Sequence, residues 1–269
     1  MKSGEIRSAE LDFDFADVKV PNTAFKRVVR DLEFDVAELA IVTFLLARAH
    51  GKPLSLLPAV VTARFQHPFL VHDATRGPLL PGDLSGRRVG LRSYSVTTAA
   101  WIRALLADDY GVGSEQVHWV AFEEPHVAEY RDPPNVERAP PGTDMISMLL
   151  GGLLDAAIVG ERPGDPRLVP VIPDPAGAAQ AWHRRTGALQ VNHMLVAKDA
   201  LTKDHPQAAE EIVRLFSESK RAAGLPARET LDMNPVGRAA NRRNLEVAID
   251  CVYRQGMIPT RFEPEALFA

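Results

Sequence analysis

The strongest constraint on the fold is the alternation of short apolar runs with amphipathic segments along the whole chain. Strands that alternate with helices are typical of the α/β class, in which the sheets are mostly parallel. No internal repeat accompanies the alternation. Strands are predicted over residues 10–18, 34–40, 54–61, 67–73, 87–91, 117–122, 153–160, 167–173 and 189–201, and helices over residues 22–31, 40–51, 97–110, 142–152, 206–224 and 242–256.

The composition is that of a globular protein with a substantial core and no nucleic-acid or membrane partner. The chain has 269 residues, of which 46% are hydrophobic and 25% charged, and its formal net charge is −4. A chain of this charge without a run of Lys and Arg lacks the field that attracts nucleic acid or anionic lipid. No apolar run reaches the roughly 18 residues needed to span a bilayer.

The only cysteine, Cys251, lies in a helical apolar pattern, which favours a buried structural thiol over a nucleophile. One cysteine cannot form an intrachain disulfide, and the sequence has no Cys/His spacing typical of a metal site. The first residues lack the apolar core of a signal peptide. We therefore expect a cytoplasmic protein without an essential metal.

The order of the elements predicts two lobes that the chain crosses between near residues 63–73 and 187–199. Residues 1–82 and 194–269 would form the first lobe, and residues 83–193 the second. Ligands would then bind in the cleft between the lobes, near the carboxyl ends of strands. The Pro-rich segment 130–144 is long and polar for a connection, so it is either a ligand loop or a solvated excursion.

The stretch "RSYSVTT" (residues 92–98) stands where a predicted strand meets the helix over residues 97–110. It contains one arginine and five hydroxyl groups. A helix cap requires one hydroxyl, and the amide groups at a helix N-terminus also attract anions. We therefore favour an anion site over simple capping for this stretch.

Five segments occur in a characteristic order and spacing: "FDVAELA", "RFQHPFLV", "DLSGRRVGLRSYSVTTAAWIRALLADDYGV", "AFEEPHVAEYRDPPNVERAPPGTD" and "GLLDAAIVG". Together they resemble the 4,5-dihydroxyphthalate decarboxylase family. The resemblance implies a two-lobed type II periplasmic-binding-protein-like fold, with two three-layer α/β lobes and a cleft between them. Proteins of this kind normally begin with a strand upstream of "KSGEIRSAELDF". We therefore expect the first strand to be missing, because the natural chain starts upstream of Met1 or because the first lobe is reorganised.

The resemblance implies a carboxy-lyase of aromatic catabolism that converts 4,5-dihydroxyphthalate to protocatechuate and CO2 without oxidation. This reaction needs anchors for the carboxylates, a poorly solvated place for the leaving group and a proton donor for the ring carbon. A hydroxyl para to the leaving carboxylate lets the ring take up the proton first. No organic cofactor is therefore expected.

These demands select residues at the predicted edges of the cleft. His67 is the predicted proton donor, His193 is the next candidate, and Glu38 would accept from a ring hydroxyl. For the two histidines, the structural alternative is a core histidine whose hydrogen bonds are made within the protein. For Glu38, it is charge compensation at a helix N-terminus. The residues predicted to bind the substrate are Arg64, Gln66, Arg92, Ser93, Tyr94, Ser95, Thr97, Thr98, His126, Tyr130 and Asn192.

A second interpretation keeps the same fold without catalysis. In that case the protein binds an aromatic or other small carboxylate as a transport component or sensor. Both interpretations need the carboxylate anchors, but only the enzyme needs a proton donor. The expected partner is a small aromatic carboxylate in either case, and the resemblance is compatible with a homo-oligomer.

Overall fold

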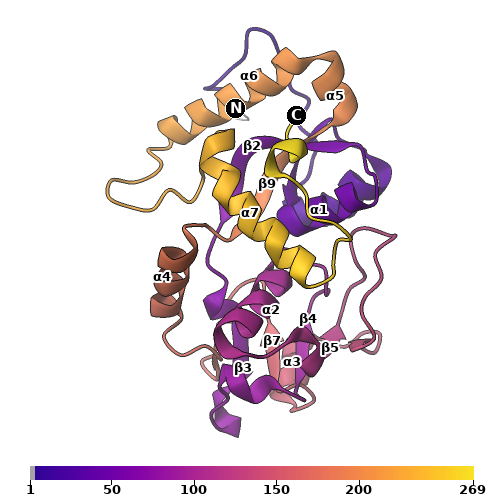
Figure 1. The fold of residues 1–269 in the computed structure, drawn as a ribbon, viewed down its shortest axis with the longest axis vertical. Coiled ribbons are helices and arrows are strands. Elements are labelled where there is room, and N and C mark those ends of the chain that lie inside the picture. Colours follow the sequence, from indigo (N-terminus) through magenta and orange to yellow (C-terminus); the bar gives the residue numbers. More distant parts are fainter. Residues whose placement is uncertain (1–3) are drawn as a thin grey trace. The chain divides into compact units, whose positions relative to one another are not determined.

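The computed structural model describes residues 4–269, which form two compact units (Figure 1). The first unit contains the residues up to Arg64, Val191–Tyr253 and Ile258–Ala269, and the second contains Phe65–Gln190 and Arg254–Met257. The sequence-based boundaries differ in three places. Residues 191–193, which begin β9, belong to the first unit. Residues 65–82 belong to the second unit because the strand at Leu70–Asp73 pairs within its sheet. The short segment Arg254–Met257 also belongs there.

The first unit is built on an antiparallel sheet with the strand order β1-β9-β2. One face of this sheet packs Leu195 and Ala197 of β9 against Ala209 and Ile212 of α6. The strands are β1 (Val36–Ala40), β2 (Leu54–Ala63) and β9 (Val191–Lys198). The α-helices that begin in this unit are α1 (Ile41–Ala49), α5 (Asp199–Asp204), α6 (Pro206–Ala222) and α7 (Arg238–Arg254). The predicted helix over 22–31 is instead a 3-10 turn, Pro21–Ala24, followed by the π-helical segment Arg27–Asp31.

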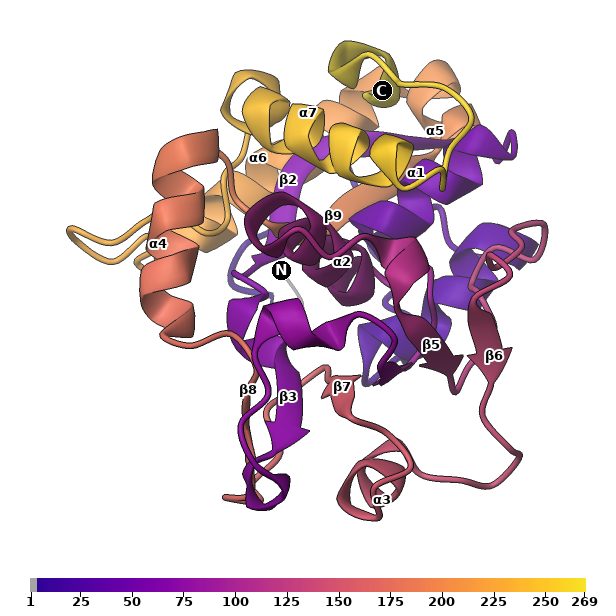
Figure 2. The ribbon, with the colours of Figure 1, turned by 60° about the horizontal axis from the view of Figure 1, so that its bottom comes forward.

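The second unit is built on a six-stranded mixed sheet with the order β6-β5-β4-β7-β3-β8 (Figure 2). Strands β4 to β7 are parallel to one another, whereas β3 is antiparallel to both β7 and β8. The strands are β3 (Leu70–Asp73), β4 (Arg88–Leu91), β5 (His118–Ala121), β6 (Val136–Arg138), β7 (Ala156–Ile158) and β8 (Leu168–Pro170). The helices are α2 (Thr97–Tyr110), α3 (Met145–Leu150) and α4 (Pro175–Thr186).

Two apolar clusters make the second unit a three-layer structure. Val89 and Leu91 of β4 pack with Ile102 of α2 on one face, and residues of β3, β5 and β7 pack with α3 on the other. Gly90 lies between these residues and faces α3. A Cβ atom there would lie 2.6 Å from a side-chain carbon of Leu154, so a larger residue would require the buried Leu154 side chain to move.

Several sequence-based predictions about the elements are wrong. The sheets are not mostly parallel, because the three described strands of the first unit are all antiparallel. Residues 10–18 form no strand; Leu11 and Phe13 instead cover the apolar cluster beside α6, and Ser8 Oγ donates to Glu211. The Pro-rich segment is not merely a loop, since it contains β6 at the edge of the sheet. Helices α4 and α5 were not predicted.

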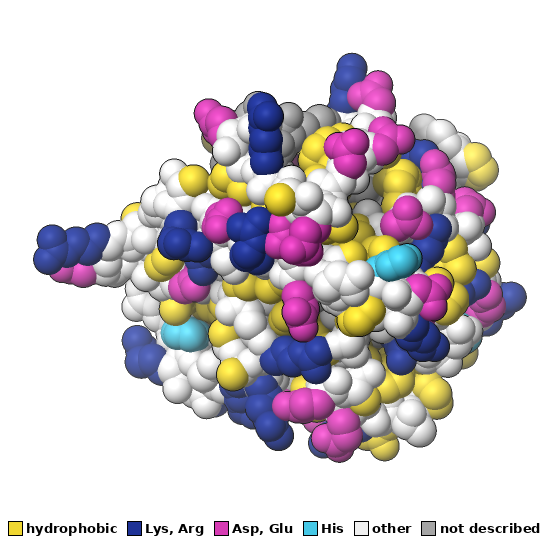
Figure 3. Space-filling view, turned by 90° about the horizontal axis from the view of Figure 1, so that it is seen from above, with side chains coloured by type: hydrophobic (Ala, Val, Ile, Leu, Met, Phe, Trp, Pro, Cys, Tyr) yellow, Lys and Arg dark blue, Asp and Glu magenta, His cyan; other side chains and the backbone are white. Residues whose placement is uncertain are grey.

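The face of the molecule in Figure 3 carries acidic and basic side chains interspersed, rather than gathered into an area of one sign. Charges of opposite sign also pair along the helices, as where Arg214 contacts both Glu211 and Glu218 at 2.6 Å on α6. Such exposed pairs contribute little to stability. Within residues 4–269, no helix is long and apolar enough to cross a membrane.

Candidate active site

The predicted substrate-binding residues of the second unit gather at one edge of its sheet. The parallel strands β4, β5 and β7 end together, because Leu91 pairs with both Ala121 and Ile158. Strand β3 runs the other way, so its first residue, Leu70, also pairs with Ile158. The loops after β4 and β5 and the residues just before β3 therefore meet at this carboxyl edge. In open α/β sheets this edge is the usual place for a ligand.

The turn after β4 is fixed by backbone hydrogen bonds from the neighbouring loop. Glu123 N donates to Arg92 O at 2.6 Å, and Phe122 N donates to Leu91 O at 3.2 Å. The Arg92 guanidinium lies 3.8 Å from the Glu123 carboxylate and is about one-third exposed. This cation is therefore held loosely enough to bind a ligand carboxylate in addition.

The N-cap position of α2 is not occupied by one of the hydroxyl-bearing residues of the turn. Val96 is the N-cap residue of α2, and its side chain makes no capping hydrogen bond. Ser93 and Ser95 are buried, with their hydroxyl oxygens 3.3 Å apart, and Thr97 is buried in the first turn. Thr98 is half-buried beside it. The N-terminus of a 14-residue helix thus adjoins buried hydroxyls and Arg92, a composition that suits an anion.

Tyr94 has a different position from its neighbours in the turn. Its ring lies in the apolar core of the second unit, and its hydroxyl is 2.7 Å from Ser114 Oγ. The buried guanidinium of Arg103 lies over the same ring at 3.6 Å and donates to Tyr94 O at 2.8 Å. Tyr94 and Arg103 therefore support the turn from within, and we leave Tyr94 out of the substrate-contacting group.

The loop after β5 supplies two further predicted residues at the carboxyl edge. His126 is buried, and Tyr130 packs against the apolar cluster on the α2 side of the sheet. Burial raises the pKa of the Tyr130 hydroxyl, so this group stays protonated and able to donate. Arg138 of β6 holds the loop by donating to Glu123 O and, at 2.5 Å, to the Asp132 carboxylate.

His67 begins the short 3-10 turn His67–Phe69, which leads into β3, and is 1% exposed. Among the described residues, none makes a hydrogen bond with either ring nitrogen. Burial, and secondarily the positive charge of Arg185, lower its pKa from 6.5 to about 4. His67 is therefore neutral at pH 7, which suits a hydrogen-bonding role better than the donation of a proton.

This lowered pKa predicts an acid-dependent loss of stability. Between pH 6.5 and pH 4 the unfolded chain binds a proton at His67 that the folded chain does not, so the free energy of unfolding falls as the pH decreases. From pH 7 to pH 4.5 this loss should be about 2.5 kcal/mol. Urea unfolding of His67→Phe should lack that part of the loss. His118→Gln, at an exposed position, should show the same profile as the natural protein, and an unchanged profile in His67→Phe would contradict the assignment.

Glu38 and His193 form a hydrogen-bonded pair in the first unit. His193 on β9 is opposite Ala40 on β1, so Glu38, two residues before Ala40, lies on the same face of the sheet. His193 Nδ1 is 2.5 Å from Glu38 Oε1, and both side chains are about one-fifth exposed. The ring also packs edge-on against Phe25, with 5.1 Å between the ring centroids. A carboxylate on Nδ1 orients the ring and balances the charge of an imidazolium, which leaves Nε2 to transfer a proton.

The remaining predicted residues lie along the two crossing segments. Arg64 follows the end of β2 in the first unit and is half-buried. Asn192 is buried on β9, but the alternation of side chains turns it to the face opposite His193. Gln66 is buried in the second unit, where its backbone N–H donates to Gln190 Oε1 at 2.6 Å. Sequence reasoning missed Gln190, and no local pattern marks it.

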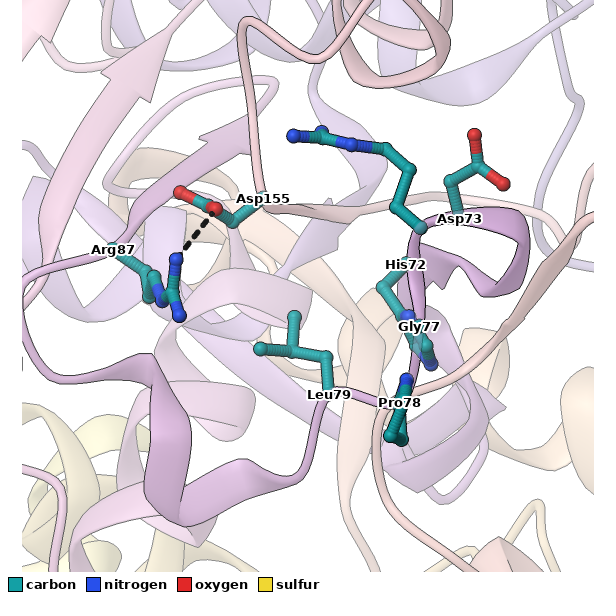
Figure 4. Close-up of a pocket in the computed structure, with 8 residues that line it drawn as sticks. His72, Asp73, Gly77, Pro78, Leu79, Arg87 and Asp155 are labelled. Carbon is teal, nitrogen blue, oxygen red and sulfur yellow. Dashed lines mark hydrogen bonds and ion pairs between the residues drawn. The ribbon is translucent and has the colours of Figure 1, made fainter.

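A small pocket lies at the other edge of the same sheet (Figure 4). Its lining includes Asp73 at the carboxyl end of β3 and Arg87 just before β4, both remote along their strands from Leu70 and Leu91. Its charges already have partners: Arg87 contacts Asp155 at 3.3 Å, and Asp73 accepts from Thr75. The pocket is therefore separate from the candidate site. No cluster of three metal-ligating side chains is found in the described part of the chain.

Solved structures define the class of fold. The chain is similar to the periplasmic aliphatic sulphonate binding protein SsuA from Escherichia coli, with 14% identity and a TM-score of 0.55 over 92% of this chain and 83% of that one. It is similar to the alkanesulfonate-binding protein SsuA from Xanthomonas axonopodis pv. citri, with 13% identity and a TM-score of 0.53 over 91% and 83%. The expected two-lobed periplasmic-binding-protein fold is thus confirmed. At these identities, only the fold is shared.

Sequence relatives define the family. A Pseudomonas putida protein named 4,5-dihydroxyphthalate decarboxylase is 30% identical over 194 residues, which cover 67% of this chain and 75% of that protein. A Comamonas testosteroni protein of the same name is 28% identical over 222 residues, covering 76% of this chain but 66% of the relative, slightly less than two thirds. No family model matches. The chain belongs to the 4,5-dihydroxyphthalate decarboxylase family.

Proposed function

We propose that this protein is a non-oxidative, cofactor-independent decarboxylase of a dihydroxylated aromatic dicarboxylate. The expected reaction converts 4,5-dihydroxyphthalate to protocatechuate and CO2, in cytoplasmic aromatic catabolism. The observation that carries the proposal is the 30% identity to the Pseudomonas protein of that name. In the reaction the bond from the ring to one carboxylate breaks, CO2 leaves, and the ring carbon gains one proton.

The anion-binding part of the proposal rests on the carboxyl edge of the second unit. A dicarboxylate needs a cation and directed donors, and Arg92 with the buried serines and the N-terminus of α2 provides both. Arg64 remains a second candidate for a carboxylate clamp. A guanidinium that binds one carboxylate leaves the other free to depart as CO2.

The proton-transfer part of the proposal rests on the pair of His193 and Glu38. We assign donation to His193 rather than to His67, because the pKa of His67 is about 4 and its neutral ring is a poor acid at pH 7. The Glu38 carboxylate at 2.5 Å would stabilise the imidazolium that donates to the ring carbon. The ring hydroxyl para to the departing carboxylate makes this protonation feasible before CO2 leaves.

The direct test is to incubate the protein with 4,5-dihydroxyphthalate and to measure protocatechuate by chromatography and CO2 by release. We expect both products in equal amounts, and in D2O one deuterium at the ring carbon that lost its carboxylate. Activity should survive dialysis against EDTA. Tight binding of the substrate without either product would instead support the non-catalytic binding protein.

A further inference from the structure

Gln190 is a wholly buried amide whose two ends are in different situations. It lies in the second unit, one residue before β9, and its side chain is 0% exposed. Its Oε1 accepts a hydrogen bond from the backbone N–H of Gln66 at 2.6 Å. Its Nε2 makes no hydrogen bond with any residue that the structure describes. Buried amide groups rarely lack a partner, so this nitrogen needs an explanation.

The bond to Gln66 decides which end of the amide is unsatisfied. If the amide were turned over, its NH2 group would face the backbone N–H of Gln66, and two donors would meet. The oxygen must therefore face Gln66, and the NH2 group must face away from it. The bond to Gln66 therefore fixes Nε2 of Gln190 as the hydrogen-bond donor that remains without a partner among the described residues.

The segment that holds this donor is tightly packed. Phe65, next to Gln66 in the chain, packs against Trp182 and His183 of α4 with ring centroids 6.1 and 5.8 Å apart. His183 Nδ1 is also 2.8 Å from Ala188 O, two residues before Gln190. The donor is thus held by a fixed support, as a binding group should be.

His67 is a second buried group without a hydrogen-bond partner among the described residues, and it lies in the same segment as Gln66. It follows Gln66 directly, it is as deeply buried, and neither of its nitrogens has a hydrogen-bond partner among residues 4–269. A neutral imidazole has one N–H donor. An acceptor placed between this N–H and the NH2 group of Gln190 would satisfy both residues at once.

We infer that Gln190 Nε2 and the ring N–H of His67 form a subsite for the substrate carboxylate that departs as CO2. The inference rests on the proposed function for the assignment of this carboxylate as the leaving one. A carboxylate is a pure acceptor with four lone-pair sites, so it can accept from both donors at once. Both donors are uncharged and buried, whereas Arg92 is cationic and about one-third exposed. Neutral donors orient a carboxylate without the strong stabilisation that would oppose its loss.

The test is a change that removes only the donor. Gln190→Glu keeps an oxygen for the Gln66 N–H but replaces NH2 by a second oxygen, which repels a carboxylate. We expect the Kd for phthalate, measured by calorimetry, to rise at least 10-fold. The Kd for protocatechuate, which has only the retained carboxylate, should stay within 2-fold. Gln116→Glu is the matched control, because Gln116 Oε1 also accepts a backbone N–H at 2.6 Å but in an exposed turn.

Equal losses for both ligands, or no loss for either, would overturn the inference. If Gln190→Glu does not fold, Gln190→Met removes the donor without adding charge and is measured in the same way. If neither variant folds, the amide resonances of Gln190 in the natural protein decide, since they should move downfield with phthalate and not with protocatechuate. Because phthalate lacks the ring hydroxyls and is not expected to react, these results are independent of turnover. Failure of the decarboxylation assay is therefore distinguishable from failure of the subsite.

Discussion

Replacing His193 with glutamine should lower kcat for 4,5-dihydroxyphthalate by about 10²- to 10⁴-fold, the range expected when a general acid is lost. Glutamine can still hydrogen-bond to Glu38, but it cannot carry the transferred proton. The Kd for phthalate should change by less than about 3-fold, because the proposed carboxylate anchors are unaltered. Stopped-flow or steady-state kinetics together with calorimetry would separate the two effects.

Two further variants test whether the effect belongs to the pair. Glu38→Gln should reduce kcat less than the loss of His193 does, since it removes the charge at 2.5 Å but keeps the ring. His50→Gln, at an exposed histidine after α1 in the same unit, should have no effect. Imidazole in solution should partly restore His193→Ala. A nearly normal kcat in His193→Gln would return the role of donor to His67 or to another group.

The parts of the fold that local patterns specify were predictable. The helix over 97–110 has the predicted bounds because one apolar face and a C-terminal glycine, Gly111 at a φ of +67°, define it. Residues 10–18 show the limit of this reasoning. Their alternation gives one apolar face, but Leu11 and Phe13 use it to cover the cluster beside α6 instead of joining a sheet. Alternation specifies a face, whereas strand pairing depends on a distant partner.

The candidate site was predictable where it depends on chain order and unpredictable where it depends on register. Arg92 and the serines stand after a strand and before a helix, so their place at a carboxyl edge follows from the α/β pattern. The bond between Glu38 and His193 spans 155 residues and requires that His193 pair with Ala40. A shift of one residue would turn one side chain to the other face. Tyr94 stands between two serines in the sequence, but its ring lies in the apolar core, which also depends on tertiary packing.

Arg92→Met should raise the Kd for both phthalate and protocatechuate about 10- to 100-fold, because a hydrogen-bonded charge contributes about 1.5–3 kcal/mol. Arg88→Met is the matched control. Arg88 begins β4 and Arg92 follows its end, and their side chains are 44% and 36% exposed. Each faces one glutamate, at 2.6 Å for Arg88 and Glu137 and at 3.8 Å for Arg92 and Glu123. Only Arg92 lies at the carboxyl edge.

The pairing of Arg92 with Glu123 supplies a change in the opposite direction. Glu123→Gln removes the competing anion, so it should tighten phthalate binding by a few-fold, and added salt should reduce that gain. Calorimetry on the three variants at two salt concentrations would compare these effects directly. If Arg88→Met and Arg92→Met weaken phthalate binding equally, the two cations act only through net charge. That result would contradict a carboxylate-binding site at the carboxyl edge. If only Arg92→Met weakens binding, the retained carboxylate is held at the end of β4, where the parallel strands and the N-terminus of α2 meet.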